Sequence, residues 1–402
     1  MINVAVLGYG TVGSGVVEVI KTNKTLIDKR IADEINVKYV LDLRDFPGDE
    51  VEKVLVHDFE VILNDPEIKI VAEAMGGVEP AYTFAKKSLE AGKNFCTSNK
   101  ELVAKHGPEL IKIAKDHSVN FLFEASVGGG IPIIRPINES LTPDDVTEIV
   151  GILNGTTNYI LTKMAKEGSD FDTVLRRAQE LGYAEKNPEA DVEGYDACRK
   201  IAILASLVTG KYVDFEDIKT EGITKITDTD FKYANLLGLS IKLFGRFKVD
   251  NGKYYASVTP VMIDKTHPLF SVEDVKNGIL LRGNMVGDVM FYGSGAGKLP
   301  TASAVVSDII EEARHLDKTI DIFMDSEKLE LDDIENSESR FFVRAKNMDK
   351  DAAENLFGEV EVINLGELDD EIGFITRSMT EKAFAETASK CENIITRIRV
   401  EY

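Results

Sequence analysis

Apolar runs of strand length alternate with amphipathic stretches through roughly the first 120 residues of the chain. Residues 2–7 (INVAVL) form the first apolar run, and the spacing after them predicts a helix that reaches about Asp28. Further strands are predicted at 35–43 and 69–77, and a further helix at 79–93. This alternation predicts an α/β fold with an N-terminal Rossmann-type, doubly wound parallel sheet.

The middle and the end of the chain follow different patterns. Residues 253–263 and 279–293 alternate between apolar and polar positions like antiparallel strands, and one helix is predicted from Asp191 to Val208. These elements predict a central α+β domain with a mixed sheet. From Arg340 onward the predicted order is strand, helix, strand, strand, helix, strand, which is typical of a small ferredoxin-like βαββαβ module.

Domain boundaries are predicted where these patterns change. The expected domains are 1–130, completed by 301–318; then 131–300; a polar linker at 319–339; and 340–402, with its second strand at 360–368.

Composition excludes several classes of function. The chain has 402 residues, of which 44% are apolar, so it can bury two or three cores. Its formal net charge of −22 makes nucleic acid and anionic membranes poor partners. We expect no membrane span and a cytoplasmic location, because neither a bilayer-length apolar run nor a cleavable leader is apparent. Three separated cysteines favour neither a disulfide framework nor a zinc site.

A glycine turn follows the first predicted strand directly. Gly8, Gly10 and Gly13 form G-x-G-x-x-G between a strand and an amphipathic helix, the context in which this pattern binds a dinucleotide. Asp42, at the end of the second strand, could hold the ribose hydroxyls of NAD, whereas Arg44 could meet the 2′-phosphate of NADP. The sequence leaves both cofactors open, and a solvated pair of charges is an equal alternative.

Other polar and glycine-rich turns also fall at strand ends. Lys100 comes just after a strand, at the sheet edge where such folds bind ligands, although an ordinary surface lysine fits equally well. Glu124 precedes the glycine cluster 128–130, which could hold a cation or form a tight crossover. A further turn at 293–297 could close over a cofactor or act as a hinge, and Thr301 or Ser303 is expected to cap the helix after it. Three more positions could contact ligands at turns: Gly76, Gly155 and Thr156. Thr156 or Thr157 could cap the helix that starts there.

The richest cluster of polar residues lies between Ala178 and Val208. Asp196 and Lys200 are spaced to share one face at the start of the predicted helix, which then becomes apolar on nearly every side. Lys200 is therefore expected at the edge of a buried helix, where it could exchange a proton with a ligand. The alternative is a helix-stabilising ion pair worth a few tenths of a kcal/mol.

The same stretch carries a specific resemblance. Its residues match the signature of the homoserine dehydrogenases at Ala178, Gly182, Tyr183, Ala184, Asn187, Pro188, Asp191, Gly194, Asp196 and Lys200. The likeness extends over the glycine turn, SNKELVA, EASVGGGIPI, GILNGTTNYIL and GAGKLPTAS, and so covers residues 1 to about 320. The C-terminal module resembles an ACT domain.

The resemblance implies an NADP- or NAD-dependent oxidoreductase that interconverts L-aspartate 4-semialdehyde and L-homoserine, on the route to threonine and methionine. It implies that Gly10, Thr11 and Val12 hold the cofactor phosphates, with Lys100 and the turn of Gly295 and Gly297 nearer the nicotinamide. With the turn residues noted above, cofactor contacts are expected at Gly8, Gly10, Thr11, Val12, Gly13, Arg44, Gly76, Lys100, Gly295 and Gly297. It implies that Glu185 binds the substrate amino group, that Asp191 and Asp196 complete the polar site, and that Lys200 is the general acid. Together with the residues noted above, substrate contacts are expected at Glu185, Asp191, Gly155, Thr156 and Tyr183, and catalytic roles for Lys200, Lys100 and Asp196. A sodium site built largely from backbone carbonyls would correspond to Glu124, Val127, Gly129 and Ile131. A homodimer or homotetramer, with dimerisation through the central domain, is expected.

One departure and two rival interpretations accompany the resemblance. Ligand-binding ACT domains commonly place an acid and a glycine before their first helix, but here the segment at 347–355 is NMDKDAAEN. An effector site is therefore left open, and the module could serve assembly. Cys96, in FCTSN, faintly resembles the nucleophile turn of phosphorylating semialdehyde dehydrogenases. A second rival is a catalytically silent NAD(P)-binding regulator.

Overall fold

The protein is described by a computed structural model that covers residues 1–366, 368 and 370–402. These residues form two compact units. The first comprises Met1–Asp145, Ala202–Phe215 and Phe291–Leu329, and the second comprises Val146–Ile201, Glu216–Met290 and Glu330–Tyr402. The predicted strand 360–368 includes Glu367, which lies outside the described residues.

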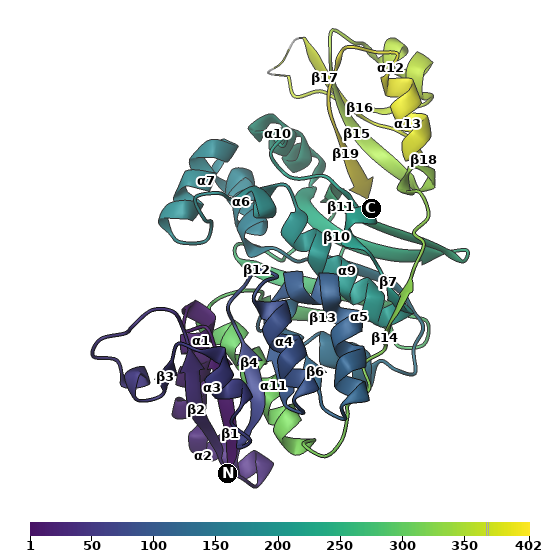
Figure 1. Cartoon of the computed structure of the whole chain (residues 1–402). Helices are drawn as coiled ribbons and strands as arrows, with labels where there is room; N and C mark the ends of the chain where they lie inside the picture. Colours follow the sequence, from purple (N-terminus) through teal and green to yellow (C-terminus); the bar gives the residue numbers. More distant parts are fainter. Residues whose placement is uncertain (367, 369) are drawn as a thin grey trace. The chain divides into compact units, whose positions relative to one another are not determined.

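The first unit is built on a six-stranded parallel sheet in the order β3-β2-β1-β4-β5-β6 (Figure 1). Its strands are β1 (Ile2–Leu7), β2 (Ile35–Leu41), β3 (Leu55–Val56), β4 (Ile68–Glu73), β5 (Asn94–Thr97) and β6 (Phe121–Leu122). All six residues of β1 are buried, as expected for a central parallel strand covered on both faces. The predicted doubly wound parallel sheet is confirmed.

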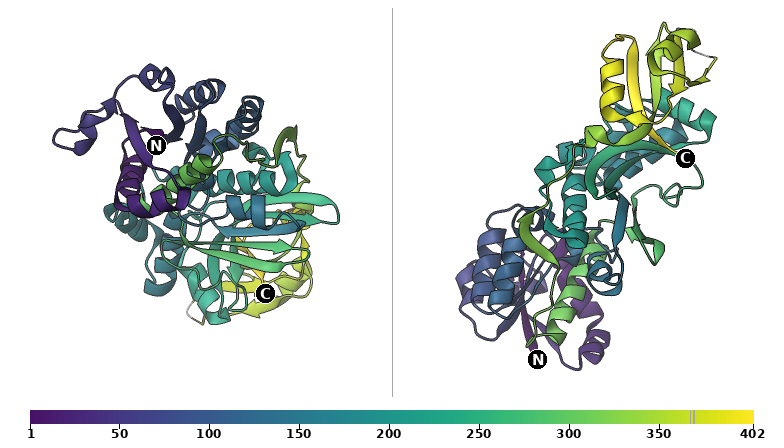
Figure 2. Two further views of the ribbon diagram at one scale, coloured as in Figure 1. Left: turned by 90° about the horizontal axis from the view of Figure 1, so that it is seen from below. Right: turned by 90° about the vertical axis from the view of Figure 1, so that its right-hand side faces the viewer.

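Helices cover both faces of this sheet (Figure 2). They are α1 (Thr11–Thr22), α2 (Lys24–Ile31), α3 (Phe59–Leu63), α4 (Ala81–Glu90), α5 (Lys100–Asp116) and α11 (Lys298–Arg314). The single helix predicted to reach Asp28 is wrong, because Asn23 ends α1 and also begins α2. Asparagine competes for backbone hydrogen bonds and so favours such helix boundaries. A small parallel pair completes the unit, β8 (Gly210–Tyr212) with β14 (Met324–Lys328).

The second unit carries the mixed sheet. Its principal order is β13-β12-β7-β10-β11-β19-β15-β17-β16. The central strands are β7 (Val146–Ile152), β9 (Lys219–Thr220), β10 (Ser240–Asp250), β11 (Lys253–Ile263), β12 (Lys276–Gly283) and β13 (Gly287–Ser294). The helices are α6 (Gly155–Glu167), α7 (Phe171–Glu180), α8 (Glu189–Val192), α9 (Tyr195–Thr209) and α10 (Asp228–Leu237); β13 and α9 each continue into the first unit.

The C-terminal module has the predicted βαββαβ order, with one additional two-residue strand, β18, before its second helix. Its elements are β15 (Glu338–Lys346), α12 (Lys350–Phe357), β16 (Glu361–Ile363), β17 (Glu371–Ile375), β18 (Met379–Thr380), α13 (Glu381–Ala388) and β19 (Ile394–Glu401). The antiparallel spatial order β19-β15-β17-β16 is that of a ferredoxin-like sheet. β19 also pairs in parallel with β11, so the module continues the central sheet.

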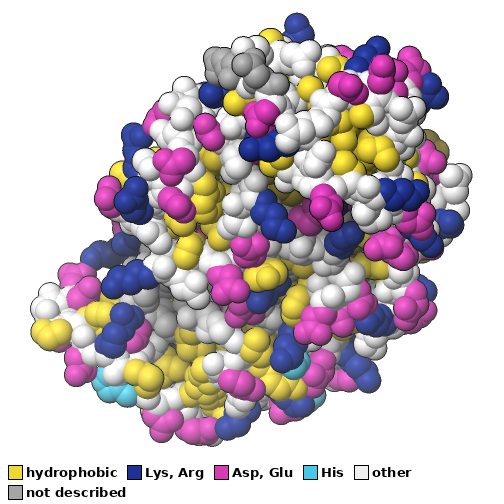
Figure 3. All heavy atoms as spheres, turned by 90° about the horizontal axis from the view of Figure 1, so that it is seen from above, with side chains coloured by type: hydrophobic (Ala, Val, Ile, Leu, Met, Phe, Trp, Pro, Cys, Tyr) yellow, Lys and Arg dark blue, Asp and Glu magenta, His cyan; other side chains and the backbone are white. Residues whose placement is uncertain are grey.

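Within the described residues, no helix combines the length and apolarity needed to cross a bilayer. On the face drawn in Figure 3, basic and acidic side chains are interspersed over the surface.

Candidate active site

The predicted glycine turn connects β1 to α1 in the first unit. Gly8 has a φ of +90°, and Gly10 stands immediately before α1 with a φ of −81°. A Cβ on Gly13 would lie 1.8 Å from the Gly8 carbonyl oxygen, whereas a Cβ on Gly10 would meet no atom within 4 Å. Gly13 therefore permits α1 to pack on the turn. Thr11 and Val12 begin α1, where backbone N–H groups point toward the turn.

A cavity of about 530 Å³ lies beside this turn. Its lining combines backbone, apolar side chains and one ion pair, including Gly8, Gly10, Leu41, Met75, Gly76 and Phe84. Gly76 has a φ of +82°, which turns the chain away after β4. An open glycine surface at a helix N-terminus and an apolar cavity fit the phosphates and the adenine of a dinucleotide, respectively.

Asp42 and Arg44 form the ion pair in this cavity. The Arg44 guanidinium donates from Nε and from Nη2 to the two Asp42 carboxylate oxygens, at 2.9 Å each, and the Tyr9 N–H donates to Asp42 at 2.8 Å. The hydrogen bonds from Arg44 hold the pKa of Asp42 well below its usual range, against the opposing effect of burial. Asp42 is therefore charged at neutral pH and has a fixed orientation.

The backbone at Lys100 is positioned by a buried network that the sequence did not reveal. Glu73, fully buried at the end of β4, accepts hydrogen bonds from the Thr97 hydroxyl at 2.5 Å and from the Gly76 N–H at 3.2 Å. The Asn99 N–H donates to the Thr97 hydroxyl, and the Asn99 side chain caps α5. Lys100 is the first residue of that helix, so the network fixes its backbone beside the turn that follows β4.

The two other glycine turns of the first unit lie against each other. The Gly130 N–H donates to the Ser294 carbonyl at 3.0 Å, and a Cβ on Gly129 would lie 2.5 Å from the Gly295 carbonyl oxygen. Gly297, with a φ of +120°, begins α11, so the expected cap at Thr301 or Ser303 is wrong. Helix α11 packs on α1 where Gly15 faces Ala302.

The Glu124 carboxylate binds backbone N–H groups that follow this turn. Its carboxylate accepts the N–H groups of Ile133, Ile134 and Arg135 at 2.6, 2.9 and 2.7 Å. These three bonds occupy both oxygens of the Glu124 carboxylate. The backbone carbonyls of Val127, Gly129 and Ile131 are therefore more available to a cation at this turn than the Glu124 carboxylate is. In the described part of the chain, no group of three His, Cys, Asp or Glu side chains could hold a metal ion.

The predicted cluster of Asp191, Asp196 and Lys200 is brought together in the second unit. Lys200 Nζ donates to Asp196 Oδ2 at 2.7 Å and to the Leu153 carbonyl oxygen at 2.8 Å. Asn154 Nδ2 donates to Asp191 at 2.7 Å and to the same Asp196 oxygen at 2.8 Å. Lys200 is 9% exposed and Asp196 is 4% exposed. One amide thus fixes two acids, and one of the acids fixes the lysine.

The single helix predicted from Asp191 is wrong. Asp191 lies in α8, and Gly194, with a φ of +84°, separates that short helix from α9, which carries Asp196 and Lys200.

The pattern of the chain did not identify Asn154 as a residue of this site. The sequence pointed to Thr156 or Thr157 as the cap of α6, whereas Asn154 Oδ1 accepts the Thr157 N–H at 2.8 Å. An asparagine directly before a predicted helix is the signal that could have found it.

The remaining predicted substrate residues lie around the start of α6 and on the loop after α7. Thr156 donates from its hydroxyl to the Tyr183 carbonyl at 2.6 Å, and the Tyr183 ring meets Tyr159 edge-on, with centroids 5.1 Å apart. A Cβ on Gly155 would lie 2.9 Å from the Val275 carbonyl oxygen, so the helix start is closely packed. Glu185 is exposed.

Cys96 is unsuited to the nucleophilic role of the rival interpretation. It lies fully buried in β5, and burial, reinforced by nearby Glu312 and Asp308, raises the pKa of its thiol well above the usual value. A thiol in that state supplies little thiolate. The structure therefore argues against a semialdehyde dehydrogenase that uses Cys96.

Comparisons with known proteins agree with this arrangement. A family model described as homoserine dehydrogenase, NAD binding domain, matches residues 8–124, and one described as homoserine dehydrogenase matches residues 132–310. A homoserine dehydrogenase of Synechocystis is 48% identical over 77% of this chain and 72% of its own length.

Solved structures give the same result. A homoserine dehydrogenase from Thiobacillus denitrificans superposes with a TM-score of 0.89 at 33% identity, covering 100% of this chain and 98% of its own. A hyperthermophilic archaeal homoserine dehydrogenase in complex with NADPH gives a TM-score of 0.65 at 28% identity, covering 77% of this chain and 97% of its own.

The dinucleotide-type sheet and the lysine held by a buried acid place the chain among the NAD(P)-dependent oxidoreductases. Within that class, the extent and identity of these matches are decisive. The chain belongs to the homoserine dehydrogenase family.

Proposed function

We propose that the chain catalyses the reversible, NAD(P)-dependent reduction of L-aspartate 4-semialdehyde to L-homoserine, with Lys200 as the general acid and base. The observation that carries this proposal is the clamp on Lys200, whose nitrogen lies between Asp196 and the Leu153 carbonyl at 2.7 and 2.8 Å. These bonds use two of its three N–H donors. The third, which no described residue is seen to accept, is directed to the substrate oxygen.

Lys200 acts on the oxygen of the reacting carbonyl. NAD(P)H, when bound, supplies the hydride; negative charge then develops on the substrate oxygen, and the nearby ammonium stabilises it and delivers a proton. Asp196 and Asn154 keep the ammonium in place during this step. In the oxidation of homoserine, Lys200 must instead accept a proton, so we expect this direction to accelerate at alkaline pH.

The charged ends of the substrate would be bound by the surrounding loops. Its ammonium group requires carboxylates, and Glu185 and Asp191 supply them. Its carboxylate requires N–H donors, which the backbone of Gly155 and Thr156 offers at the start of α6. Tyr183, whose carbonyl holds the Thr156 hydroxyl, positions this second group.

A direct assay tests the proposal. Purified protein is mixed with L-aspartate 4-semialdehyde and NADPH or NADH, and consumption of the reduced cofactor is followed by absorbance. We expect turnover with at least one cofactor, and homoserine as the product by mass spectrometry. Cofactor binding without turnover would favour the silent regulator instead.

Replacement of Arg44 should change cofactor preference. In Arg44→Ala, Asp42 keeps its charge but loses its partner, so it repels a 2′-phosphate while still accepting ribose hydroxyls. We expect the ratio of kcat/KM for NADPH to that for NADH to fall about tenfold. Arg30→Ala, which removes an exposed arginine from α2, is the control. An equal fall with both cofactors would contradict a role for Arg44 at the 2′-position.

We further propose that the C-terminal module is an ACT domain that serves assembly of a homodimer or homotetramer. Asp349, the acid before its first helix, caps α12 by accepting the Ala352 N–H at 2.8 Å, and a side chain stands where ligand-binding relatives carry glycine. Titration of the intact chain with threonine should give no saturable heat at millimolar concentration. Saturable binding would assign an effector site to the module.

A further inference from the structure

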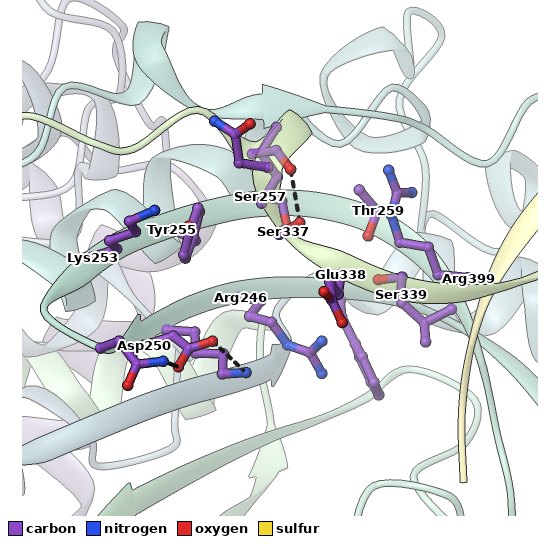
Figure 4. A pocket seen from close by; sticks show the side chains of 16 residues that line it. Arg246, Asp250, Lys253, Tyr255, Ser257, Thr259, Ser337, Glu338, Ser339 and Arg399 are labelled. Atoms are coloured by element: carbon purple, nitrogen blue, oxygen red, sulfur yellow. Dashed lines mark hydrogen bonds and ion pairs between the residues drawn. The ribbon is translucent and has the colours of Figure 1, made fainter. Parts of the chain in front are cut away.

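Two arginines of the C-terminal module hold one carboxylate of the central part of the second unit. Arg399, on β19, donates from both terminal nitrogens to the two oxygens of Glu221, at 3.0 Å each, and Arg397 donates to Glu221 at 3.0 Å. Glu381, buried at the start of α13, supports Arg399 at 2.5 Å from the other side. Arg399 also lines a polar cavity of about 430 Å³ on β10 and β11 (Figure 4).

The electrostatics of this clamp favour a fixed, charged Glu221. Burial opposes ionisation of its carboxyl, but the two guanidinium groups prevail and lower its pKa to about 2. A bidentate arginine–carboxylate pair restricts both distance and orientation. The position of the Glu221 backbone is therefore tied to β19.

The chain after Glu221 presses on the junction between α8 and α9. The Ile223 N–H donates to the Val192 carbonyl at 2.8 Å, and the Thr224 hydroxyl donates to Glu193 at 3.0 Å. A Cβ on Gly222 would lie 2.3 Å from the Val192 carbonyl oxygen, so the two backbones touch.

The same junction carries two acids of the candidate site. Asp191 precedes it on α8 and Asp196 follows it on α9, and both accept hydrogen bonds from Asn154. Gly194, at the turn between them, rests on β9 and β11, because its Cβ would lie 3.0 Å from Val258 and 3.1 Å from Thr220. Displacement of the segment 221–224 would change the separation of the two acids, and with it the orientation of Lys200.

We propose that Glu221 is a positioning residue, through which Arg397 and Arg399 of the C-terminal module hold Asp191 and Asp196 in place, and through Asp196 the side chain of Lys200. The inference rests on the proposed function for its effect on turnover, but the mechanical link concerns the protein alone. A purely structural clamp would stabilise the fold without specific influence on the α8–α9 junction.

A matched pair of variants separates these roles. Glu221→Gln leaves Arg399 with Glu381, and Glu371→Gln leaves Arg344 with Asp230, so each retains one carboxylate for its buried arginine. The Arg344 network joins the module to α10, and among the residues that the structure describes its hydrogen bonds and ion pairs do not reach the α8–α9 junction. Both variants should lower the thermal midpoint.

Turnover and hydrogen exchange are then compared. We expect Glu221→Gln to lower kcat for homoserine by about tenfold and to leave the Kd for NADPH within about twofold, whereas Glu371→Gln keeps kcat within about twofold. Glu221→Asp, which keeps the charge, should recover part of the loss. Amide exchange at residues 189–199 should accelerate in Glu221→Gln only.

Failure of the proposed role of Glu221 can be distinguished from failure of the proposed function. If the wild-type protein does not turn over homoserine, the proposed function fails, and the exchange comparison alone decides the link. Equal exchange at residues 189–199 in the two Gln variants overturns the proposal. So does wild-type kcat in Glu221→Gln, or a loss of kcat that merely follows the loss of stability in both variants.

Discussion

Replacement of Lys200 by methionine should lower kcat by about a thousandfold in both directions while the Kd for NADPH changes little. The methionine side chain is similar in length but can neither stabilise the charge on the substrate oxygen nor transfer a proton, and such contributions are typically worth about 10²–10⁴ in rate. The proposed cofactor contacts lie on the first unit, around the glycine turn, so they should persist. Stopped-flow measurement of NADPH oxidation and fluorescence titration with NADPH give the two quantities.

The nearby Lys186 supplies the control for this variant. It is exposed on the loop after α7, and Lys186→Met removes the same charge without touching Asp196. Its kcat should equal that of the wild type. If Lys200→Met retains near-normal kcat with an intact thermal transition, Lys200 has no part in the chemistry and its bond to Asp196 is structural.

The pattern of the chain predicted the parts of the fold that local signals determine. β1, the glycine turn and the start of α1 follow from an apolar run, a glycine spacing and an amphipathic stretch within about twenty residues. The βαββαβ order of the C-terminal module follows in the same way. The pairing of β19 with β11 could not be predicted, because it joins strands more than a hundred residues apart through backbone bonds that carry no local sequence signal.

In the candidate site, too, contacts between residues close in the sequence could be predicted, whereas contacts between distant residues could not. Asp196 and Lys200 could be placed together because four residues of helix separate them. Asn154 could not be connected with Asp191, since their contact depends on how α6 packs beside α8. Glu221 gave no local signal, because its arginine partners lie 176 and 178 residues farther along the chain.

Alanine at Gly13 should abolish cofactor binding because the first unit itself is disrupted. The new Cβ would lie 1.8 Å from the Gly8 carbonyl oxygen, and both groups belong to the backbone turn, so no side chain can move to relieve the overlap. Helix α1 would have to shift away from the turn, at a cost of about 3 kcal/mol or more. Thermal denaturation should show a midpoint lowered by several degrees, and titration with NADPH should show no saturable binding.

Alanine at Gly10 should instead separate binding from folding. Gly10 has an ordinary φ of −81°, and a Cβ there meets no protein atom within 4 Å, so Gly10→Ala should keep the wild-type thermal midpoint. The added methyl would enter the cavity where phosphates are expected to approach the backbone, and the Kd for NADPH should rise about tenfold or more. An unchanged Kd would contradict passage of the cofactor phosphates beside Gly10. A dinucleotide bound against this turn thus predicts that both glycine variants bind NADPH poorly for different reasons. Gly13→Ala loses binding because the fold is destabilised, and Gly10→Ala loses affinity because the added methyl occupies the binding surface.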